Sequence, residues 1–385
     1  MVCILNKTKN KKGGNIYMPK KIFCWYLFCS IILILTGCSG NFSEPTAESQ
    51  QINKRVDDHL SVDINYNAKA KNYYNIKLNK KIYSDESICN LFLKDKKFEK
   101  QLWTDGIGKT FTSGNYELRT VGNLFDYVNS AVCENYFLLV RKDNAAIPGV
   151  LRTDLKEFFN LAKLTDLDYD SSKKLNDNYI ESLGISCSLS EYYALDIKGL
   201  NLLERYILPD ENYNELKENG SLPNGRFREW KKDQEAYVFV SQVTFDDTPI
   251  HSISYSVDGQ IRETDFGCVW SIIGKDGLIS FSSGNIPGKE IERTDVTLIN
   301  MNDALLQVIK MYQNRLFTTD VCINQVDLMY IPIENSATEI TLMPAWRFQT
   351  VIKGSNNTLE TSDNYNSQDI IEYTIINATT GEVLN

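Results

Sequence analysis

The residues whose types and spacing could carry chemistry lie near the start of the chain, at Leu35-Thr36-Gly37-Cys38. A cysteine thiol is a nucleophile that a diacylglyceryl donor can alkylate. Thr36 and Gly37 are small enough to fit a signal peptidase cleft, and cleavage before Cys38 would free its amine for a further acyl chain. The spacing therefore predicts lipidation at Cys38, with signal-peptidase recognition through Leu35, Thr36 and Gly37.

The segment before Cys38 has the order of charge and hydropathy that is typical of a signal peptide. Residues 1–37 hold six lysines and no Asp, Glu or Arg, and Lys20 and Lys21 directly precede an apolar run from Ile22 to Leu35. That run is shorter than the roughly 20 residues that a membrane-spanning helix needs. We predict a cleaved leader that starts at Met1 or Met18, and a lipid-anchored protein on the extracytoplasmic face of the cell membrane.

The charge of the chain limits its partners. The formal net charge is −9, and loss of the six leader lysines takes it to −15. An anionic membrane surface repels such a body, so attachment should rest on the lipid alone. The sequence also lacks a dense Lys/Arg stripe, which argues against nucleic acid as a partner.

The cysteines after Cys38 make a poor disulfide framework. They are odd in number, widely spaced and without a C-x-x-C pair: Cys89, Cys133, Cys187, Cys268 and Cys322. A thiol inside an apolar segment behaves as a small hydrophobic group. We predict that most are buried free thiols, and a disulfide is the alternative.

The hydrophobic patterns predict an α+β fold, with antiparallel sheets each packed against one helix and two modules joined by a helical connector. The expected divisions are a signal peptide at 1–37, a flexible tether at 38–59, an N-terminal α+β domain at 60–150, a helical connector and loop at 151–234, and a C-terminal domain at 235–385.

Local signals place the elements inside these divisions. In the first half we expect strands at 61–68, 74–78, 111–121, 124–129 and 135–141, a helix at 84–94 capped by Ser84, helices at 151–164 and at 172–183 before Gly184, and a loop at 209–234. In the second half we expect strands at 236–245 and 250–256, a hairpin at Asp276-Gly277, a helix at 302–316, and strands at 326–333, 345–351 and 371–376, with a loop before the last.

Candidate catalytic and metal sites are few. His59 and His251 are the two histidines, and neither has a predictable carboxylate or thiol partner. Ser171-x-x-Lys174 and Ser362-Asp363-Asn364 are similar to motifs of serine acylases, but the third motif of that set is missing. Asp166-x-Asp168-x-Asp170 opens like a calcium loop, yet position 6 is Ser171 and not glycine. A solvated loop that caps the next helix is the favoured interpretation.

Two segments near the end of the chain carry a resemblance. They read Leu342-Met343-Pro344-Ala345-Trp346-Arg347-Phe348 and Ile376-Asn377-Ala378-Thr379-Thr380-Gly381-Glu382-Val383. A strand with a Pro-Ala-Trp-x-Phe core, followed by a last strand that ends in Asn-Ala-x-x-Gly-Glu, resembles the PepSY-like and YycH/YycI-type extracytoplasmic modules of Gram-positive bacteria. With the lipidation motif, the chain resembles uncharacterised clostridial lipoproteins.

The resemblance implies roles for particular residues and a class of function. It implies that Pro344, Trp346, Phe348, Asn377 and Gly381 are structural, with Trp346 and Phe348 facing a core and Thr380-Gly381 in a turn. It also implies contacts with an envelope protein or peptide. The chain departs from the YycH/YycI type because it has a lipid anchor in place of a transmembrane helix.

Together these observations predict a non-enzymatic protein- or peptide-binding or regulatory module, without catalytic residues, metal or cofactor. The alternative is a solute-binding lipoprotein of a transporter, for which the expected helices are few. An envelope hydrolase limited to Asp/Glu chemistry ranks third.

Metabolic labelling with an alkyne fatty acid tests the predicted lipidation. We expect the native chain and a Cys322→Ala control to take up label, and a Cys38→Ala chain to take up none, because only Cys38 follows the recognition residues. Label on the Cys38→Ala chain would contradict the prediction.

Overall fold

The computed structural model describes residues 50–66, 72–94, 97–104, 106, 108–129, 158–221, 228–251, 254–257, 260–263, 267–354 and 369–384. The chain divides into two units, Met1–Ser43 and Glu44–Asn385, and all described residues belong to the second unit. The predicted leader with Cys38, the strand at 135–141, Cys133 and the loop before the last strand lie outside the described residues.

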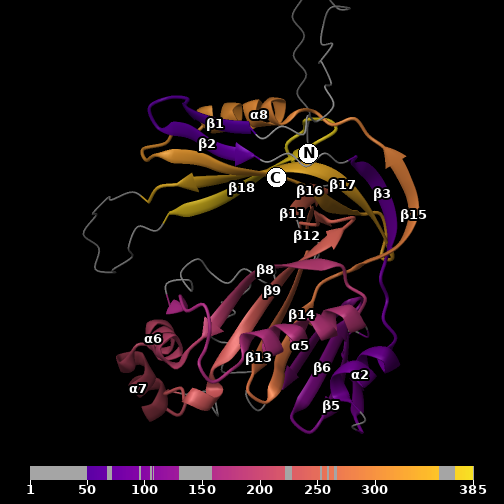
Figure 1. Ribbon diagram of the computed structural model, residues 1–385, viewed down its shortest axis with the longest axis vertical. Coiled ribbons are helices and arrows are strands. Elements are labelled where there is room, and N and C mark those ends of the chain that lie inside the picture. The colour runs from indigo at the N-terminus through magenta and orange to yellow at the C-terminus, as the bar shows by residue number, and fades with distance from the viewer. Residues whose placement is uncertain are drawn as a thin grey trace, which may run out of the picture. The chain divides into compact units, whose positions relative to one another are not determined.

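The predicted α+β class is confirmed, because two sheets carry helices packed against them (Figure 1). The seven-stranded sheet has the order β1-β2-β16-β17-β3-β15, and β18 also pairs with β17. Its strands are β1 (Gln50–Arg55), β2 (Leu60–Tyr66), β3 (Tyr74–Lys80), β15 (Pro287–Asp295), β16 (Val321–Glu334), β17 (Glu339–Ile352) and β18 (Ile370–Asn377). Its pairs are antiparallel apart from β2 with β16.

The nine-stranded sheet has the order β10-β9-β13-β14-β7-β6-β5-β4, and β8 also pairs with β9. Its strands are β4 (Glu99–Leu102), β5 (Gly108–Ser113), β6 (Tyr116–Val121), β7 (Leu124–Asn129), β8 (Cys187–Leu195), β9 (Ala236–Phe245), β10 (Thr248–Pro249), β13 (Cys268–Gly274) and β14 (Gly277–Ser283). A separate ribbon joins β11 (Ser254–Val257) to β12 (Gln260–Glu263). The helices are α2 (Asp85–Leu93), α5 (Tyr169–Ser182), α6 (Ile197–Ile207), α7 (Asp210–Glu218), the 3-10 turn η1 (Lys232–Gln234) and α8 (Met301–Gln313).

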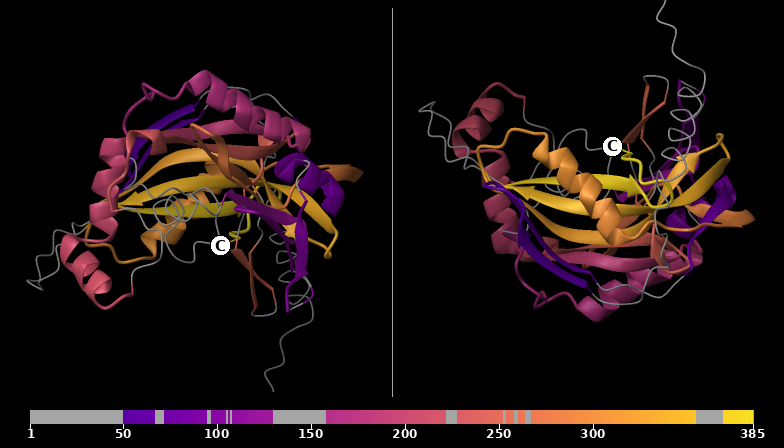
Figure 2. Two further views of the ribbon diagram at one scale, coloured as in Figure 1. Left: turned by 90° about the horizontal axis from the view of Figure 1, so that it is seen from below. Right: turned by 90° about the horizontal axis from the view of Figure 1, so that it is seen from above.

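Helix α8 covers one face of the seven-stranded sheet (Figure 2). It is amphipathic, and its buried stripe is Ala304, Leu305, Val308, Ile309 and Tyr312. The stripe belongs to the same core as Trp346 and Phe348 of β17, which are 1% and 0% exposed. Full burial of one such apolar side chain is worth about 1.5–3 kcal/mol. The burial that the resemblance implied for these two aromatic residues is therefore present.

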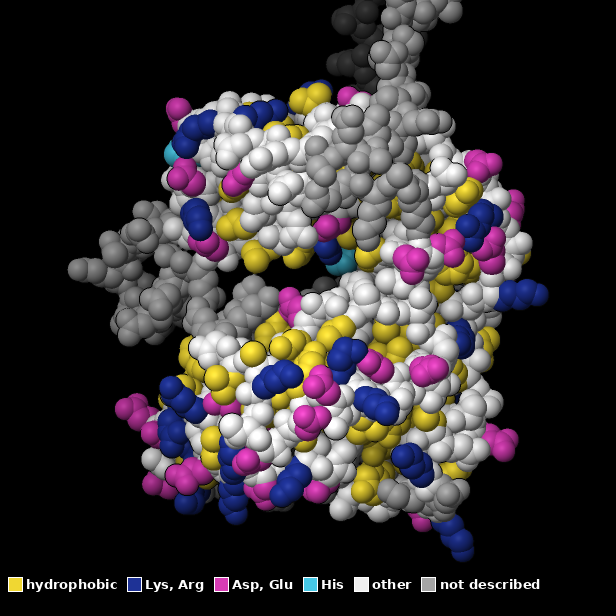
Figure 3. Space-filling model, in the orientation of Figure 1, with side chains coloured by type: hydrophobic (Ala, Val, Ile, Leu, Met, Phe, Trp, Pro, Cys, Tyr) yellow, Lys and Arg dark blue, Asp and Glu magenta, His cyan; other side chains and the backbone are white. Residues whose placement is uncertain are grey.

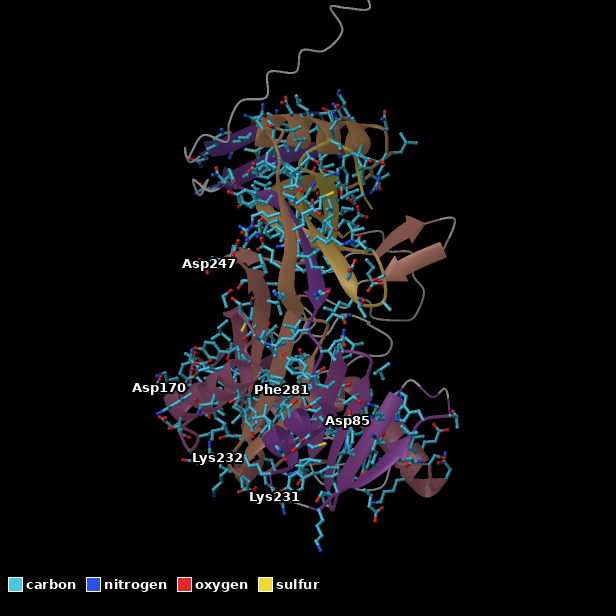
Figure 4. All side chains as sticks on the ribbon, turned by 90° about the vertical axis from the view of Figure 1, so that its right-hand side faces the viewer. Asp85, Asp170, Lys231, Lys232, Asp247 and Phe281 are labelled. Carbon is cyan, nitrogen blue, oxygen red and sulfur yellow. The ribbon has the colours of Figure 1, made fainter. Side chains whose placement is uncertain are left out.

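Helices α2 and α5 pack on the nine-stranded sheet through aromatic rings. Phe92 of α2 stacks on Tyr179 of α5 at 5.4 Å between ring centroids, and it lies equally close to Phe281 of β14. Phe281 in turn stacks on Phe125 of β7 at 6.0 Å. Figure 4 labels Phe281 in the part of the molecule that holds the nine-stranded sheet. Such ring pairs each add about 0.5–1.5 kcal/mol beyond the area that they bury.

Several local expectations are confirmed. The Ser84 hydroxyl accepts a hydrogen bond from the backbone of Ser87 and so caps α2. Gly184 follows α5 with φ at +57°, and the amides of Gly184 and Ile185 donate to the carbonyls of Glu181 and Ile180. This is the Schellman arrangement, in which a left-handed residue satisfies the last free carbonyls of a helix.

The predicted domain boundaries do not follow the sheets. Strands β2 and β3, expected in the N-terminal domain at 60–150, pair with β16, β17 and β15. Strand β7, from the same stretch, pairs with β14. The expected tether at 38–59 is also partly wrong, because residues 50–55 form β1. Hydrophobic alternation identifies a strand but not the strand that pairs with it. Pairing between strands more than 200 residues apart could therefore not be predicted from the pattern.

Three predicted elements are wrong in detail. The strand at 111–121 is the β5–β6 hairpin, which turns at Gly114 with φ at +61°. Residues 159–164, the described end of the helix expected at 151–164, are not helical. The loop at 209–234 contains α7, whose side chains are not buried. An exposed helix lacks the apolar period by which helices are recognised.

The described cysteines are free thiols, as predicted. Cys89 is buried, and Cys187, Cys268 and Cys322 are half-buried. Burial raises the pKa of the Cys89 thiol to about 11. At neutral pH this side chain is therefore uncharged and behaves as a small apolar group.

Asp168 caps α5, since its carboxylate accepts a hydrogen bond of 2.7 Å from the Ser171 amide. We expect Asp168→Ala to lower the free energy of unfolding by about 0.5–2 kcal/mol, because the amide then loses its acceptor. The control Asp166→Ala should change it by less than about 0.5 kcal/mol. Urea unfolding followed by circular dichroism measures both. Equal losses, or stabilisation of the native chain by millimolar calcium, would contradict the capping interpretation.

Candidate functional site

A pocket of about 1130 Å³ is lined by strands of both sheets. Its walls include β8 and the β9–β10 hairpin on one side and β16 and β17 on the other, together with Tyr66 and Tyr73. In Figure 3 the described surface is hollowed between the two sets of strands. The lining combines carboxylates, a guanidinium, an imidazole, amides, hydroxyls and two phenol rings, which gives it many hydrogen-bonding groups.

A tight hairpin carries the chain from one sheet to the other. Asp246 and Asp247 connect β9 to β10 with φ at +47° and +59°, as a two-residue hairpin turn of this hand requires. After β10, Ile250 forms a parallel bridge with Tyr330 of β16, and the His251 amide donates to the Tyr330 carbonyl at 2.8 Å. The imidazole of His251 is thereby placed against the seven-stranded sheet.

Side chains hold this hairpin from two directions. The Asp246 carboxylate forms an ion pair of 2.8 Å with Arg293 of β15, and that guanidinium lies 4.9 Å from the centre of the Tyr74 ring. From the other side, the Gln242 side-chain amide donates to the carbonyls of Ile250 and Gly267. These contacts fix the path of the chain up to His251.

The centre of the site is an ion pair next to this imidazole. Asp327 of β16 and Arg347 of β17 lie directly opposite each other in the ladder, so both side chains are on one face of the sheet. The guanidinium binds the Asp327 carboxylate at 2.8 Å and lies 3.2 Å from Nδ1 of His251. It also lies 5.0 Å from the centre of the Tyr373 ring. With side chains 19% and 37% exposed, Arg347 and Asp327 are partly shielded from water.

The two titratable groups beside the ion pair are uncharged at neutral pH. Burial, together with the positive charge of Arg347, lowers the pKa of His251 to about 3. Burial raises the pKa of the Cys268 thiol to about 11, and its sulfur lies 3.9 Å from Oε1 of Gln242. A thiol with such a pKa holds almost no thiolate at pH 7. These two groups therefore offer hydrogen bonds rather than proton transfer or nucleophilic attack.

Tyr66 and Tyr73 form an aromatic part of the pocket wall. The Tyr66 ring contacts Trp346 edge-on at 5.5 Å, and the Tyr73 ring lies 6.0 Å from Tyr330. Burial raises the pKa of Tyr66 to about 12, with smaller contributions from Tyr73 and Asp327, so its hydroxyl stays protonated.

The rim of the pocket is more exposed. Ser188 and Ser190 of β8 are exposed, and Asp247 is labelled at the tip of its hairpin in Figure 4. The rim therefore adds hydroxyls and a carboxylate to the aromatic and charged groups farther inside.

The residues that the resemblance implied to be structural are not among those that line the pocket. Trp346 and Phe348 point to the opposite face of β17 from Arg347, because side chains alternate along a strand. Pro344 is buried, and its carbonyl accepts from the Ala378 amide. Asn377 accepts hydrogen bonds from the amides of Thr379 and Thr380, and Gly381 has φ at +77°. They form a core and a final turn.

The sequence analysis missed Arg347 and Asp327 and set His251 aside. A usable signal was present, because Asp327 and Arg347 are the charged residues in the interior of two long strands that are rich in apolar side chains. His59, the other histidine, lies in the β1–β2 connection with its Nδ1 3.9 Å from Asp320. Ser171 and Lys174 lie on α5, and Ser362-Asp363-Asn364 is outside the described residues.

Comparison with known proteins adds a fold relationship. No protein-family model and no curated protein match the sequence. The crystal structure of an uncharacterized protein from Eubacterium rectale ATCC 33656 is similar, with a TM-score of 0.59, 14% sequence identity, and coverage of 87% of this chain and 93% of that one. At a sequence identity of 14%, this similarity shows that the two proteins share a fold. Of the helices in the described part of the chain, none is long and apolar enough to cross a membrane.

The lowered pKa of His251 predicts a pH dependence of stability. Between pH 6.5 and about 3 the unfolded chain takes up a proton on His251 that the folded chain does not. The free energy of unfolding should therefore fall as the pH falls through this range, by up to about 1.4 kcal/mol per pH unit from this group. Urea unfolding at pH 6.5 and 4.5 should show a smaller loss for His251→Gln than for the native chain or His59→Gln. Equal losses in all three would contradict the prediction.

Proposed function

We propose that this chain is a non-enzymatic, lipid-anchored protein of the extracytoplasmic membrane face that binds a segment of a protein or peptide partner in the pocket around Arg347. The observation that carries the proposal is the pocket itself, at about 1130 Å³ and lined by both sheets. Pockets for small molecules span about 300–1,000 Å³, so this one slightly exceeds the usual range.

The chemistry of the lining supports binding rather than catalysis. A general acid or base works best with a pKa near the working pH. The pKa of His251 lies well below neutral pH, and the pKa of Cys268 lies well above it. Asp327 is engaged by Arg347 and also accepts a hydrogen bond of 2.9 Å from Gln325. The inner polar groups are already ordered, so a partner would meet a preorganised surface.

The geometry of the β16 wall suits an extended chain. Gln325 and Asp327 are alternate residues of β16, whereas Ser190 on the β8 wall lies at an irregularity of its strand between Leu189 and Glu191. Alternate side chains of a strand lie in a row on one face, about 6–7 Å apart. A row with this repeat matches the repeat of a peptide in extended conformation, which is how strand-based peptide sites gain both affinity and specificity.

The location and the kind of partner rest on the sequence. The basic and apolar leader that ends at Cys38 supports a lipid anchor. The resemblance of 342–348 and 376–383 to PepSY-like and YycH/YycI-type modules supports a protein or peptide partner at the cell envelope.

A solute receptor of a transporter is the second candidate, because a pocket is also what such a receptor needs. The strand pairs nevertheless are antiparallel apart from β2 with β16, whereas α/β ligand sites lie at the carboxyl ends of parallel strands. A thermal-shift screen with sugars and free amino acids separates the two. Stabilisation by one of these solutes, without any peptide binding, would favour the receptor.

Panning of a phage-displayed random dodecapeptide library on the full chain in detergent tests the proposal. We expect enriched peptides, and we expect their synthetic forms to bind a Ser190→Trp chain at least about tenfold more weakly, because the indole would occupy the pocket rim. Ser182→Trp, at an exposed position on α5 outside the pocket, is the matched control and should bind as the native chain does. Failure to enrich any peptide, or equal binding by both variants, would count against the proposed function.

A further inference from the structure

The contact between Arg347 and His251 fixes where the imidazole carries its proton. A guanidinium has donors only and stays protonated in proteins. Nδ1 of His251 lies 3.2 Å from Nη1 of Arg347, so Nδ1 must be the acceptor in this contact. A neutral imidazole has one N–H, and here it is therefore on Nε2.

The remaining donor belongs to the pocket. His251 is one of the residues that line the pocket, and within the described part of the chain Nε2 forms no hydrogen bond. A polar group in a partly shielded place gains most from an occupant that supplies the missing partner. An acceptor atom on the bound molecule would therefore satisfy the Nε2–H donor.

The charges around the pocket determine which acceptor fits. Asp246, Asp247 and Asp327 line it, and Arg347 is the cation among the described lining residues. Arg347 is occupied by Asp327, and Asp246 by Arg293. Asp247 is exposed at the rim. A carboxylate or phosphate would meet net negative charge without a free cation, so a neutral acceptor is favoured over an anion.

We infer that His251 is a specificity-determining residue whose Nε2–H donates a hydrogen bond to a backbone carbonyl of the bound peptide, with Arg347 as the positioning residue that sets its tautomer. This inference rests on the proposed peptide-binding function and adds the chemistry of recognition to it. The titratable and charged groups next to the ring are Arg347 on β17, which Asp327 on β16 binds, and Tyr373 on β18, whose ring centre lies 6.2 Å from that of the imidazole.

Selective ¹⁵N labelling of histidine tests the donor role, because the chain has two histidines and His59→Gln leaves one. The full chain in detergent should show one protonated and one unprotonated imidazole nitrogen at pH 7 in long-range ¹H–¹⁵N spectra. The probe is the most enriched dodecapeptide from the panning, with acetylated and amidated ends. Its addition should move the Nε2–H proton resonance downfield, and acetate at the same concentration should leave it in place.

Three variants separate the donor from the shape of the ring. His251→Phe keeps the ring and removes the donor, and it should weaken binding of the dodecapeptide about tenfold. His251→Gln keeps an N–H near the position of Nε2 and should restore most of the affinity. Arg347→Met releases Nδ1, and its spectrum should show a mixture of tautomers or a charged ring.

The outcomes distinguish this inference from the proposed function. If the dodecapeptide binds but leaves the Nε2–H resonance unmoved, or if His251→Phe binds it as tightly as the native chain, the donor role is wrong and the peptide-binding function stands. If acetate produces the shift, the preference for a neutral acceptor is wrong. If panning enriches no peptide, both the donor role of His251 and the proposed peptide-binding function are contradicted.

Discussion

The arrangement of the pocket depends on one short piece of backbone pairing. Ile250 and His251 leave the nine-stranded sheet through β10 and pair with Tyr330 of the seven-stranded sheet. This pairing brings the imidazole within 3.2 Å of Arg347, although the two residues are 96 positions apart in sequence. A backbone bridge fixes position more firmly than a contact between long side chains, because fewer rotatable bonds separate the paired groups.

Strand β17 shows how one element can contribute both to a core and to the lining of a pocket. Trp346 and Phe348 pack under α8, while Arg347 between them faces the pocket. Since side chains alternate along a strand, the burial of the two aromatic rings determines the side on which the guanidinium lies. The ladder then places Asp327 opposite Arg347. The orientation of the ion pair thus follows from the packing of the core.

Sequence patterns predicted the features that depend on neighbouring residues. The Ser84 cap, the glycine after α5, the Asp276-Gly277 hairpin and the stripe of α8 are set within a few positions of the chain, and each was recognised. Features that depend on which strands pair were not predicted. The predicted domain boundaries differ from the sheets because the chain forms the first strands of the seven-stranded sheet, then most of the nine-stranded sheet, and then returns to the first sheet at β15. His251 was set aside for the same reason, since its partner Arg347 is supplied by a distant strand.

Burial and the neighbouring Arg347 together determine the charge of His251 across the pH range. Histidine is the residue that most often changes charge near neutrality. Here burial of the imidazole is the larger cause of its lowered pKa, and the positive charge of Arg347, 3.2 Å from Nδ1, adds to it. The ring consequently remains a neutral donor throughout the physiological range. If the chain lies outside the cytoplasm as proposed, it meets variable pH, and a site whose inner groups keep their charge would offer the proposed partner the same hydrogen bonds across that variation.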